Sequence, residues 1–435
     1  MTTKPTHTDA ELFLRDFRSL SRIGATPGGG VDRQAASVAD AQSRTWFTTL
    51  LSQYGFTVRT DAIGNIFGLM EWHPGAPYVV VGSHLDSQPL AGKFDGAYGV
   101  AAALHAGRRL AAEHGRADGG RADEDPADGD PAARPKYNLA VVDWFNEEGS
   151  RFAPSMMGSS VYTAKLPAPE ALAIRDTDGV TVAEALAAIG HPVGSWTGPT
   201  PAAAAEIHIE QGRSLEDTGA TIGLVESCWA AEKFTVVVHG EQAHTGSTVI
   251  ADRHDALLGA ARLVVLAREL ADRFPGGVLH TSVGQLTVVP NSPVVVPRRV
   301  DLTLDLRSAD ESVLAEAKRL LEQGVKQIEQ DAAVTVEVRE SHAWGVRPYS
   351  AAGVELARDC ADGLGLSSRP VQTLAGHDSI NMNDAVPTVM LFVPSREGIS
   401  HHEGEHTDDA DLCAGVDVLT EVVRQLCRGE LDGAR

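Results

Sequence analysis

The sequence predicts an α/β protein in which a mostly parallel sheet forms the larger domain and a smaller domain is inserted into it. Three observations predict this: the length, four apolar runs of strand length, and a change of pattern in the middle of the chain. The chain has 435 residues, which is enough for two domains. Hydrophobic residues make up 43% and charged residues 22%, as in ordinary globular proteins.

Each of the four apolar runs leads directly into a polar or glycine-containing segment. The runs are "YVVV" at 78–81, "LAVVDWF" at 139–145, "AAAAEIHI" at 202–209 and "TVMLFV" at 388–393. Continuous apolar strands that alternate with helices are typical of a parallel sheet that is buried on both faces. In such sheets the functional residues gather at the carboxyl ends of the strands. The candidates within reach of these ends are His84, Glu147, Glu148, His208 and His401.

The middle of the chain follows a different order. Strand-like and helix-like segments succeed one another as β-α-β-β-α-β, the ferredoxin-like pattern. They are 233–239, 252–274, 279–289, 299–307, 310–330 and 333–339. In the second helix one face carries only apolar residues, namely Leu314, Ala317, Leu321, Val325 and Ile328. We therefore expect an inserted domain at 220–340, with 1–219 and 341–435 forming the larger domain.

One segment of the larger domain has low complexity. Residues 116–135 read "RADGGRADEDPADGDPAARP", which is almost entirely Ala, Asp, Gly, Arg and Pro. Such a composition cannot bury enough apolar surface to fold. We expect a disordered surface insertion that carries no chemistry.

The charge and the cysteines restrict the classes of partner and location. The formal net charge is −22, from 37 Lys and Arg against 59 Asp and Glu. Such an acidic chain argues against nucleic acid and against an anionic membrane as partners. The four cysteines have no metal-ligand spacing, which indicates a reduced, cytoplasmic protein. The N-terminal sequence has no apolar signal core, and no run approaches the length of a membrane span.

Several strand ends carry residues that bind divalent metals. His84 and Asp86 form an H-x-D pair whose side chains project to the same side of an extended chain. The Asp86 carboxylate can therefore hold the imidazole in one tautomer. Asp95 follows in the glycine-flanked loop "GKFDGAYGV". Each residue taken alone is most simply explained by hydrogen bonding within a loop, but their coincidence at several strand ends indicates a metal site.

The whole ligand set has three imidazoles and two carboxylates, which suit one or two ions such as Zn²⁺ or Mn²⁺. The set is His84, Asp95, Glu148, His208 and His401. An aspartate can bridge two ions because each of its oxygens can bind one. In "FNEEGSRF" one of the adjacent glutamates can bind metal, while the other stays free as a base for metal-bound water.

Nine motifs form a specific combination that spans nearly the whole chain apart from 116–135. They are GATPGGGVDR (24–33), DAIGN (61–65), GSHLDSQPLAGKFDGAYGV (82–100), FNEEGSRF (145–152), HIEQG (208–212), GEQAHTGSTVIADRHDAL (240–257), VDLTLDLR (300–307), AGHD (375–378) and GISHHEGE (398–405). Together they resemble the hydantoinase/carbamoylase branch of the dinuclear-metal amidohydrolases. This branch includes N-carbamoyl-L-amino acid hydrolases, β-ureidopropionases and allantoate amidohydrolases.

The resemblance implies two divalent ions per subunit, Zn²⁺ or Mn²⁺, with Co²⁺ or Ni²⁺ as alternatives. His84 and His208 would bind one ion and Glu148 and His401 the other, with Asp95 as the bridge.

The resemblance also implies that Glu147 is the general base. His402 is a rival to His401, which we prefer because it completes "GISH", with Glu405 at the matching later acidic position.

The resemblance also implies substrate contacts and a homodimer, with the inserted domain as a dimerisation or lid domain. His244 would reach into the partner's active site and steady the tetrahedral oxyanion. Arg307, on the polar face of its strand, would hold the substrate carboxylate with its planar guanidinium. Gln211 and Gly376 are the other substrate contacts of this kind, and we also expect a contact from Asn291, which lies near the position of a family asparagine that this chain lacks.

Two positions depart from the family pattern. The usual Asn-Val-(Val/Ile)-Pro before the arginine strand is here Val294, Val295, Val296 and Pro297, so the substrate-binding asparagine is absent. The usual first glycine of "GAGHD" is here Leu374. Both changes remove polarity or space near the expected substrate, which puts ureido specificity in question and leaves the metal chemistry intact.

We therefore expect a metal-dependent amidohydrolase that hydrolyses the C–N bond of small N-carbamoyl-L-amino acids. Allantoate, or an N-acyl amino acid with a less polar acyl group, is the alternative substrate. A peptidase is a further alternative, against which HIEQG and Arg307 argue. A non-catalytic binding protein on the same fold would need a lost ligand or base, and none is lost.

Overall fold

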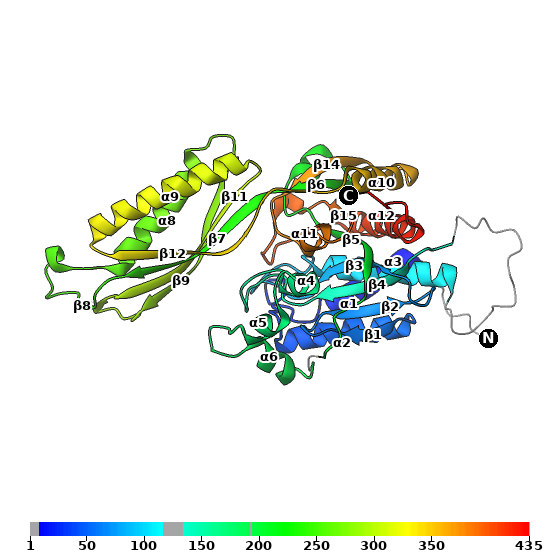
Figure 1. Cartoon of the computed structure of the whole chain (residues 1–435), viewed down its shortest axis with the longest axis horizontal. Coiled ribbons are helices and arrows are strands. Elements are labelled where there is room, and N and C mark those ends of the chain that lie inside the picture. Colours follow the sequence, from blue (N-terminus) through cyan, green and yellow to red (C-terminus); the bar gives the residue numbers. More distant parts are fainter. Residues whose placement is uncertain (1–7, 116–133, 192–193, 435) are drawn as a thin grey trace, which may run out of the picture. The chain divides into compact units, whose positions relative to one another are not determined.

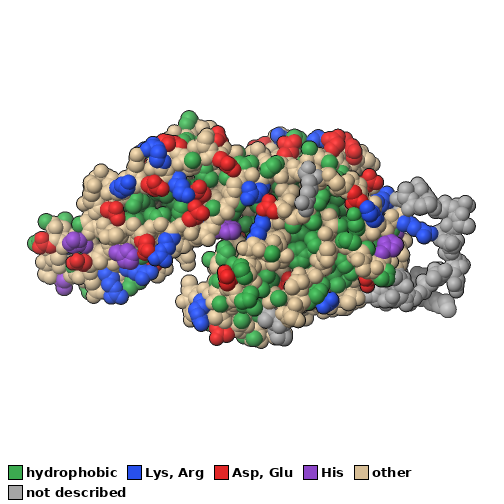
Figure 2. Space-filling view, in the orientation of Figure 1, with side chains coloured by type: hydrophobic (Ala, Val, Ile, Leu, Met, Phe, Trp, Pro, Cys, Tyr) green, Lys and Arg blue, Asp and Glu red, His purple; other side chains and the backbone are tan. Residues whose placement is uncertain are grey.

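The computed structural model describes residues 8–115, 134–191 and 194–434. The chain divides into two units, the first formed by 1–226 and 349–435 and the second by Ser227–Pro348 (Figure 1). Most of the expected insertion at 116–135 lies outside the described residues. Lysine and arginine side chains are dispersed among aspartate and glutamate on the face that Figure 2 shows.

A large sheet organises the first unit. Its strands lie in the order β1-β2-β4-β3-β5-β15-β6, and β14 also pairs with β6. Their bounds are Thr57–Thr60 (β1), Ile66–Met70 (β2), Tyr78–His84 (β3), Asn138–Trp144 (β4), Pro201–Ile209 (β5), Ile222–Cys228 (β6), Ser368–Thr373 (β14) and Thr388–Val393 (β15). The neighbours β4, β3, β5 and β15 run parallel, whereas β1 and β2 are antiparallel to the strands beside them and β6 is antiparallel to β15.

The four parallel strands are the four apolar runs of the sequence, and both of their faces are buried. Val79 and Val81 of β3 pack into the core on one face, and Val80 packs into the core on the other. In β4, Leu139 packs into the core on the same face as Val79, and Ala140 packs into the core on the face of Val80. Since successive residues of a strand point to opposite faces, a strand buried on both sides must be apolar throughout. The predicted α/β fold with a mostly parallel central sheet is confirmed.

Helices cover this sheet and connect its strands. The longer helices are α1 (Asp9–Leu20), α2 (Val38–Gln53), α3 (Ala97–His114), α10 (Ala351–Gly363) and α12 (Asp409–Arg428). The shorter ones are α4 (Met157–Tyr162), α5 (Ala168–Ala173), α6 (Val182–Ala188), α7 (Ser214–Thr218) and α11 (Asp378–Asn383). Helix α3 begins directly after the loop that contains Asp95. Among the described residues, no helix is both long enough and apolar enough to cross a membrane.

The second unit has the β-α-β-β-α-β order that the sequence predicts. Its elements are β7 (Ala230–His239), α8 (Ala256–Asp272), β9 (His280–Val289), β11 (Arg299–Ser308), α9 (Glu311–Ala332) and β12 (Thr335–Trp344). The strands form an antiparallel sheet in the order β12-β7-β11-β9. Helices α8 and α9 lie on one face of it (Figure 1). The predicted apolar face of α9, from Leu314 to Ile328, is buried there.

The chain passes between the units at two neighbouring points. The backbone N–H of Tyr349 donates to the carbonyl of Glu226 over 2.9 Å. Beside this bond, β13 (Arg347–Pro348) pairs with Ser227 and Cys228 of β6. A further short pair joins β8 (Ala243–His244) to β10 (Val295–Val296) within the second unit.

Candidate active site

The carboxyl ends of the parallel strands deliver most of the predicted metal ligands to one edge of the sheet. His84 is the last residue of β3, and His208 is the penultimate residue of β5. Glu147 and Glu148 follow β4, and His401 follows β15 after a short loop. Because the strands are parallel, their carboxyl ends meet at this edge, as the apolar runs predict.

Two groups of possible metal ligands share Asp95. In the first group, Asp95 Oδ1 lies 3.5 Å from His84 Nε2 and 3.1 Å from His208 Nε2. In the second, Asp95 Oδ2 lies 3.4 Å from His401 Nε2, which is 3.3 Å from Glu148 Oε2. Within each group all ligand atoms lie within 4.8 Å of one another. One oxygen of Asp95 therefore faces each group, as a bridging carboxylate requires.

The donor set and its spacing fit divalent ions. Imidazole nitrogen and carboxylate oxygen bind zinc at about 2.0–2.2 Å, so two donors of one tetrahedral ion lie roughly 3.3 Å apart. The distances of 3.1 to 3.5 Å across Asp95 match that spacing. Burial lowers the pKa of His401, but the carboxylates of Glu148 and Asp95 outweigh burial and raise it to about 9. The cluster of carboxylates thus draws positive charge to this edge of the sheet.

The backbone fixes the tautomer of both histidines of the first group. His84 Nδ1 lies 2.9 Å from the carbonyl oxygen of Asp86, and His208 Nδ1 lies 2.9 Å from that of Ile209. Since a carbonyl only accepts, each Nδ1 carries the proton and each Nε2 presents its lone pair to the Asp95 side. Gly96 has φ +60°, and a Cβ there would come within 2.3 Å of the His84 ring. Glycine is therefore required beside these rings.

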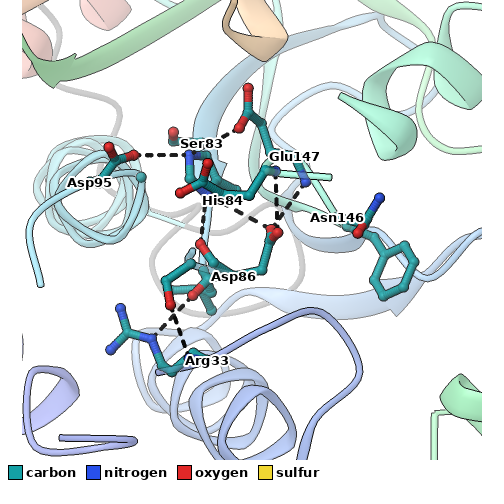
Figure 3. Close-up of polar contacts among 12 residues, drawn as sticks. Arg33, Ser83, His84, Asp86, Asp95, Asn146 and Glu147 are labelled. Atoms are coloured by element: carbon teal, nitrogen blue, oxygen red, sulfur yellow. Dashed lines mark hydrogen bonds and ion pairs between the residues drawn. The ribbon is translucent and has the colours of Figure 1, made fainter. Parts of the chain in front are cut away.

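The carboxylate of Asp86 has a different partner from the one expected. It lies 3.8 Å from His84 Nδ1, beyond hydrogen-bond reach, so the carbonyl of Asp86 rather than its carboxylate orients the ring. Asp86 Oδ1 accepts the backbone N–H of Glu147 over 3.1 Å, and Oδ2 accepts that of Glu148 over 3.2 Å (Figure 3). The H-x-D spacing predicts that the Asp86 carboxylate lies on the same side of the chain as the His84 ring. It does not determine whether the carboxylate or the carbonyl oxygen of Asp86 accepts the ring N–H.

The two adjacent glutamates face different groups. Glu148 belongs to the second group, where Gln88 donates its backbone N–H over 3.2 Å and its side-chain Nε2 over 3.0 Å to the two carboxylate oxygens. Glu147 Oε2 lies 3.6 Å from His84 Nε2, on the side of the first group. Burial raises the pKa of Glu147 well above its ordinary value. His84 opposes this shift, while the carboxylates of Asp378 and Glu148 add to it.

Several residues near the site were not predicted. Ser400 donates to Asp95 Oδ2 over 2.7 Å, and Gln88 holds Glu148 as described above. Both lie inside quoted motifs, which is the signal that could have pointed to them. The His377 ring lies against the His208 ring, with centroids 4.6 Å apart. Among the predicted substrate contacts, Gln211 donates Nε2 to Asp95 Oδ2 over 2.7 Å.

The alternatives at 401 and 402 are placed differently. His401 Nε2 faces Asp95 and Glu148, whereas His402 is exposed and its Nδ1 accepts the backbone N–H of Gly404 over 2.9 Å. Gly376, expected to contact substrate, lies two residues before α11 in the first unit.

The remaining predicted residues lie in the second unit. His244 Nδ1 accepts the backbone N–H groups of Gly246 over 3.0 Å and Ser247 over 3.1 Å, so its ring proton is on Nε2. Arg307 donates Nε and Nη2 to the two oxygens of Asp305, each over 2.9 Å. Asn291 is exposed after β9.

Several known proteins are similar to this chain over most of its length. The sequence profile of peptidase family M20/M25/M40 matches residues 130–425. A Mycolicibacterium smegmatis protein named as a hydrolase is 56% identical over 427 residues, 97% of this chain and 94% of that protein. An N-carbamoyl-L-amino-acid amidohydrolase of Paenarthrobacter aurescens is 34% identical over 425 residues, 96% of this chain and 98% of that protein.

A solved structure shows the same similarity in three dimensions. An amidase of the hydantoinase/carbamoylase family from Burkholderia vietnamiensis matches with a TM-score of 0.88 at 35% identity, covering 96% of this chain and 97% of that chain. The family profile covers more than half of this sequence, and the relatives match it over nearly its full length. The chain is therefore a hydrolase that belongs to peptidase family M20/M25/M40, in the hydantoinase/carbamoylase branch of amidases.

Proposed function

We propose that this hydrolase uses two divalent metal ions to hydrolyse the C–N bond of N-carbamoyl-L-amino acids. The observation that carries the proposal is Asp95, whose two oxygens face two separate ligand groups with Glu147 beside the first. The name of the Paenarthrobacter aurescens relative supports the substrate class. A carbamoyl substrate would yield the amino acid, ammonia and carbon dioxide.

The metal ions would be Zn²⁺ or Mn²⁺, with Co²⁺ or Ni²⁺ as alternatives. His84, His208 and Asp95 would hold one, and Asp95, Glu148 and His401 the other. When bound, such ions supply Lewis acidity at the substrate carbonyl and make a nearby water more acidic.

The chain's own groups would move the protons and hold the substrate. Glu147 is buried and has a raised pKa, which suits a group that takes a proton from water and returns it to the leaving nitrogen. His244 presents an Nε2–H that can donate to the oxyanion. Arg307 would hold the substrate carboxylate, and Gln211, Asn291 and Gly376 would line the substrate site. Asp86 would orient the backbone of Glu147.

We further infer that the enzyme is a cytoplasmic homodimer in which His244 serves the partner's active site. The apolar side chains that α8 exposes support a dimer contact on the second unit; they are Leu257, Leu258, Val264 and Val265. Arg262 is exposed on the same helix, and exposed apolar side chains that gather on one element mark interaction surfaces. The four free cysteines support a reducing location. Light scattering on the purified protein tests the dimer.

A substrate panel tests the activity. Ammonia and free amino acid should be measured with N-carbamoyl-L-amino acids, their D-enantiomers, N-acyl amino acids, allantoate and dipeptides, with each of the four metals added to metal-free protein. We expect N-carbamoyl-L-amino acids to be hydrolysed fastest. Cleavage of dipeptides in preference to all the others would overturn the proposal. An N-acyl preference would keep the chemistry and change the substrate, as the apolar Val294 and Leu374 allow.

A further inference from the structure

His401 is the most exposed member of the two ligand groups, and the chain around it needs support. Its side chain is 47% exposed, whereas that of Asp95 is 3% exposed. It lies in an irregular loop and has a positive φ of 53°. Two glutamates follow it closely, Glu403 and Glu405, and each binds a different glycine-containing segment.

Glu405 ties this loop to the segment that carries Asp95. It is 3% exposed, and its Oε1 accepts the backbone N–H of Phe94 over 2.8 Å and of Asp95 over 3.0 Å. A Cβ at Gly92 would lie 2.1 Å from this oxygen, so the side chain needs glycine there.

Glu403 ties the same loop to the glycine segment, defined here as residues 26–30. The Thr26 hydroxyl donates a hydrogen bond to Glu403 Oε1. A Cβ at Gly28 would lie 2.2 Å from Glu403 Oε2, and one at Gly30 would lie 2.9 Å from Glu403 Cα. The carboxylate therefore occupies the space that a side chain at Gly28 would need, and the Cα of Glu403 lies close to Gly30.

The residues that directly follow the glycine segment are fastened to the loop that follows His84. Val31 and Ala91 exchange two backbone hydrogen bonds of 2.9 Å. Arg33, which is fully buried, donates its backbone N–H to Ser87 Oγ over 2.9 Å and its Nε to the Leu85 carbonyl over 3.2 Å (Figure 3). Glu403 thus joins the His401 loop to a segment of the first unit that is itself held in place by hydrogen bonds.

From these contacts we infer that Glu403 is a positioning residue that sets the metal affinity of the second group by holding the His401 loop. Without this clamp, the His401 loop would lose conformational entropy when an ion binds, and that loss would lower the affinity for the ion. Residues that orient metal ligands typically change metal affinity by about 10- to 100-fold when mutated. The inference rests on the proposed function, because it takes the two groups to be metal sites.

Three substitutions and one control test this role. Glu403→Ala removes the clamp, and Gly28→Ala displaces the carboxylate without removing it, so it tests the clamp even where Glu403→Ala fails to fold. Glu403→Gln keeps an acceptor for Thr26 and the side-chain shape. Pro27→Ala alters an exposed residue in the same segment and serves as the control.

The measurement is titration of metal-free protein with Mn²⁺ by calorimetry, with the thermal midpoint of the metal-free protein recorded alongside. For Glu403→Ala and Gly28→Ala we expect one of two sites to weaken about 10- to 100-fold while the other changes less than about twofold. Glu403→Gln should weaken that site less, and Pro27→Ala should match the wild type. Adding Glu403→Ala to His401→Ala should produce no further loss, because both changes act through one ligand.

Two outcomes would overturn the inference alone: wild-type affinities in both clamp variants, or equal weakening of both sites. An additive loss in the double variant would also overturn it. If the wild-type protein binds fewer than two ions, the proposed function fails first and this inference fails with it.

Discussion

Asp86 accepts the backbone N–H of Glu147 with one carboxylate oxygen, over 3.1 Å. Its other oxygen accepts the N–H of Glu148 over 3.2 Å, so one side chain at the end of β3 holds the turn after β4. Both N–H groups are thus held in place, while the side chain of Glu147 faces His84 and that of Glu148 faces His401. This explains how adjacent, mutually repelling carboxylates can serve different roles.

The first prediction separates the two glutamates. Glu147→Gln should keep both metal ions but lower kcat at least ~10²-fold, the usual scale for a general base. Glu148→Gln should instead weaken one metal site, because it replaces the carboxylate of a candidate ligand in the second group. Metal content by mass spectrometry and kcat, measured on the same samples, distinguish the two. Near-full activity of Glu147→Gln would remove it from the mechanism.

The second prediction concerns His244. If it serves the partner's active site, mixing inactive Glu147→Gln subunits with inactive His244→Ala subunits should restore part of the activity. Some sites of the mixed dimers would then combine an intact Glu147 with an intact His244. Subunit exchange must be shown independently with labelled protein. Exchange without recovery would mean that His244 acts within its own subunit or has no catalytic role.

The third prediction concerns Val294, which is 60% exposed in the second unit and whose carbonyl accepts the backbone N–H of Thr245. A valine cannot hydrogen-bond a ureido group, and unpaired polar atoms cost roughly 1–3 kcal/mol, a factor of about 5 to 150 in kcat/KM. We expect weak activity on allantoate, which has two ureido groups. Val294→Asn should raise the ratio of ureido to N-acyl activity. Allantoate turnover faster than every N-carbamoyl and N-acyl amino acid would contradict this role.

The fourth prediction concerns stability in acid. Burial raises the pKa of Asp16, but the nearby His105 imidazole and hydrogen bonds from Tyr54 and Arg15 outweigh it and lower the pKa to about 2. A lowered pKa stabilises the folded protein above the ordinary value of 3.8, and this contribution is lost as pH falls from 3.8 toward 2. Asp16→Asn should therefore be less stable than wild type at pH 6, with a difference that shrinks below pH 4. Urea midpoints across this range provide the measurement.

The parts of the fold that follow from local pattern could be read from the sequence. The four central strands were predictable because burial on both faces demands unbroken apolar runs. The apolar face of α9 was predictable because it repeats with helical spacing. The flanking strand β1 was not, since Thr57–Thr60 is short and alternates between exposed and partly buried residues.

The candidate site shows the same division. The ligand types at and after the strand ends make Asp95, His208 and their neighbours predictable from the sequence. The contacts of Glu403 with the glycine segment and of Gln88 with Glu148 join residues far apart in sequence. The spacing of apolar residues along the chain carries no information about such long-range contacts, so they can be seen only in the folded structure. The choice between the carbonyl and the carboxylate of Asp86 likewise depends on backbone geometry that spacing does not encode.

The chain leaves the first unit at Glu226 and returns at Tyr349, and these two residues are hydrogen-bonded to each other. Because the inserted segment begins and ends at two bonded residues, the two parts of the first unit stay together whatever segment is inserted. The insertion therefore costs little additional loop-closure entropy. In evolutionary terms this junction is a permissive insertion point, where one module can be gained, lost or exchanged while the loops that carry Asp95 and Glu147 remain the same. A lineage could thus change the inserted module without rebuilding the edge of the sheet that holds the candidate metal ligands.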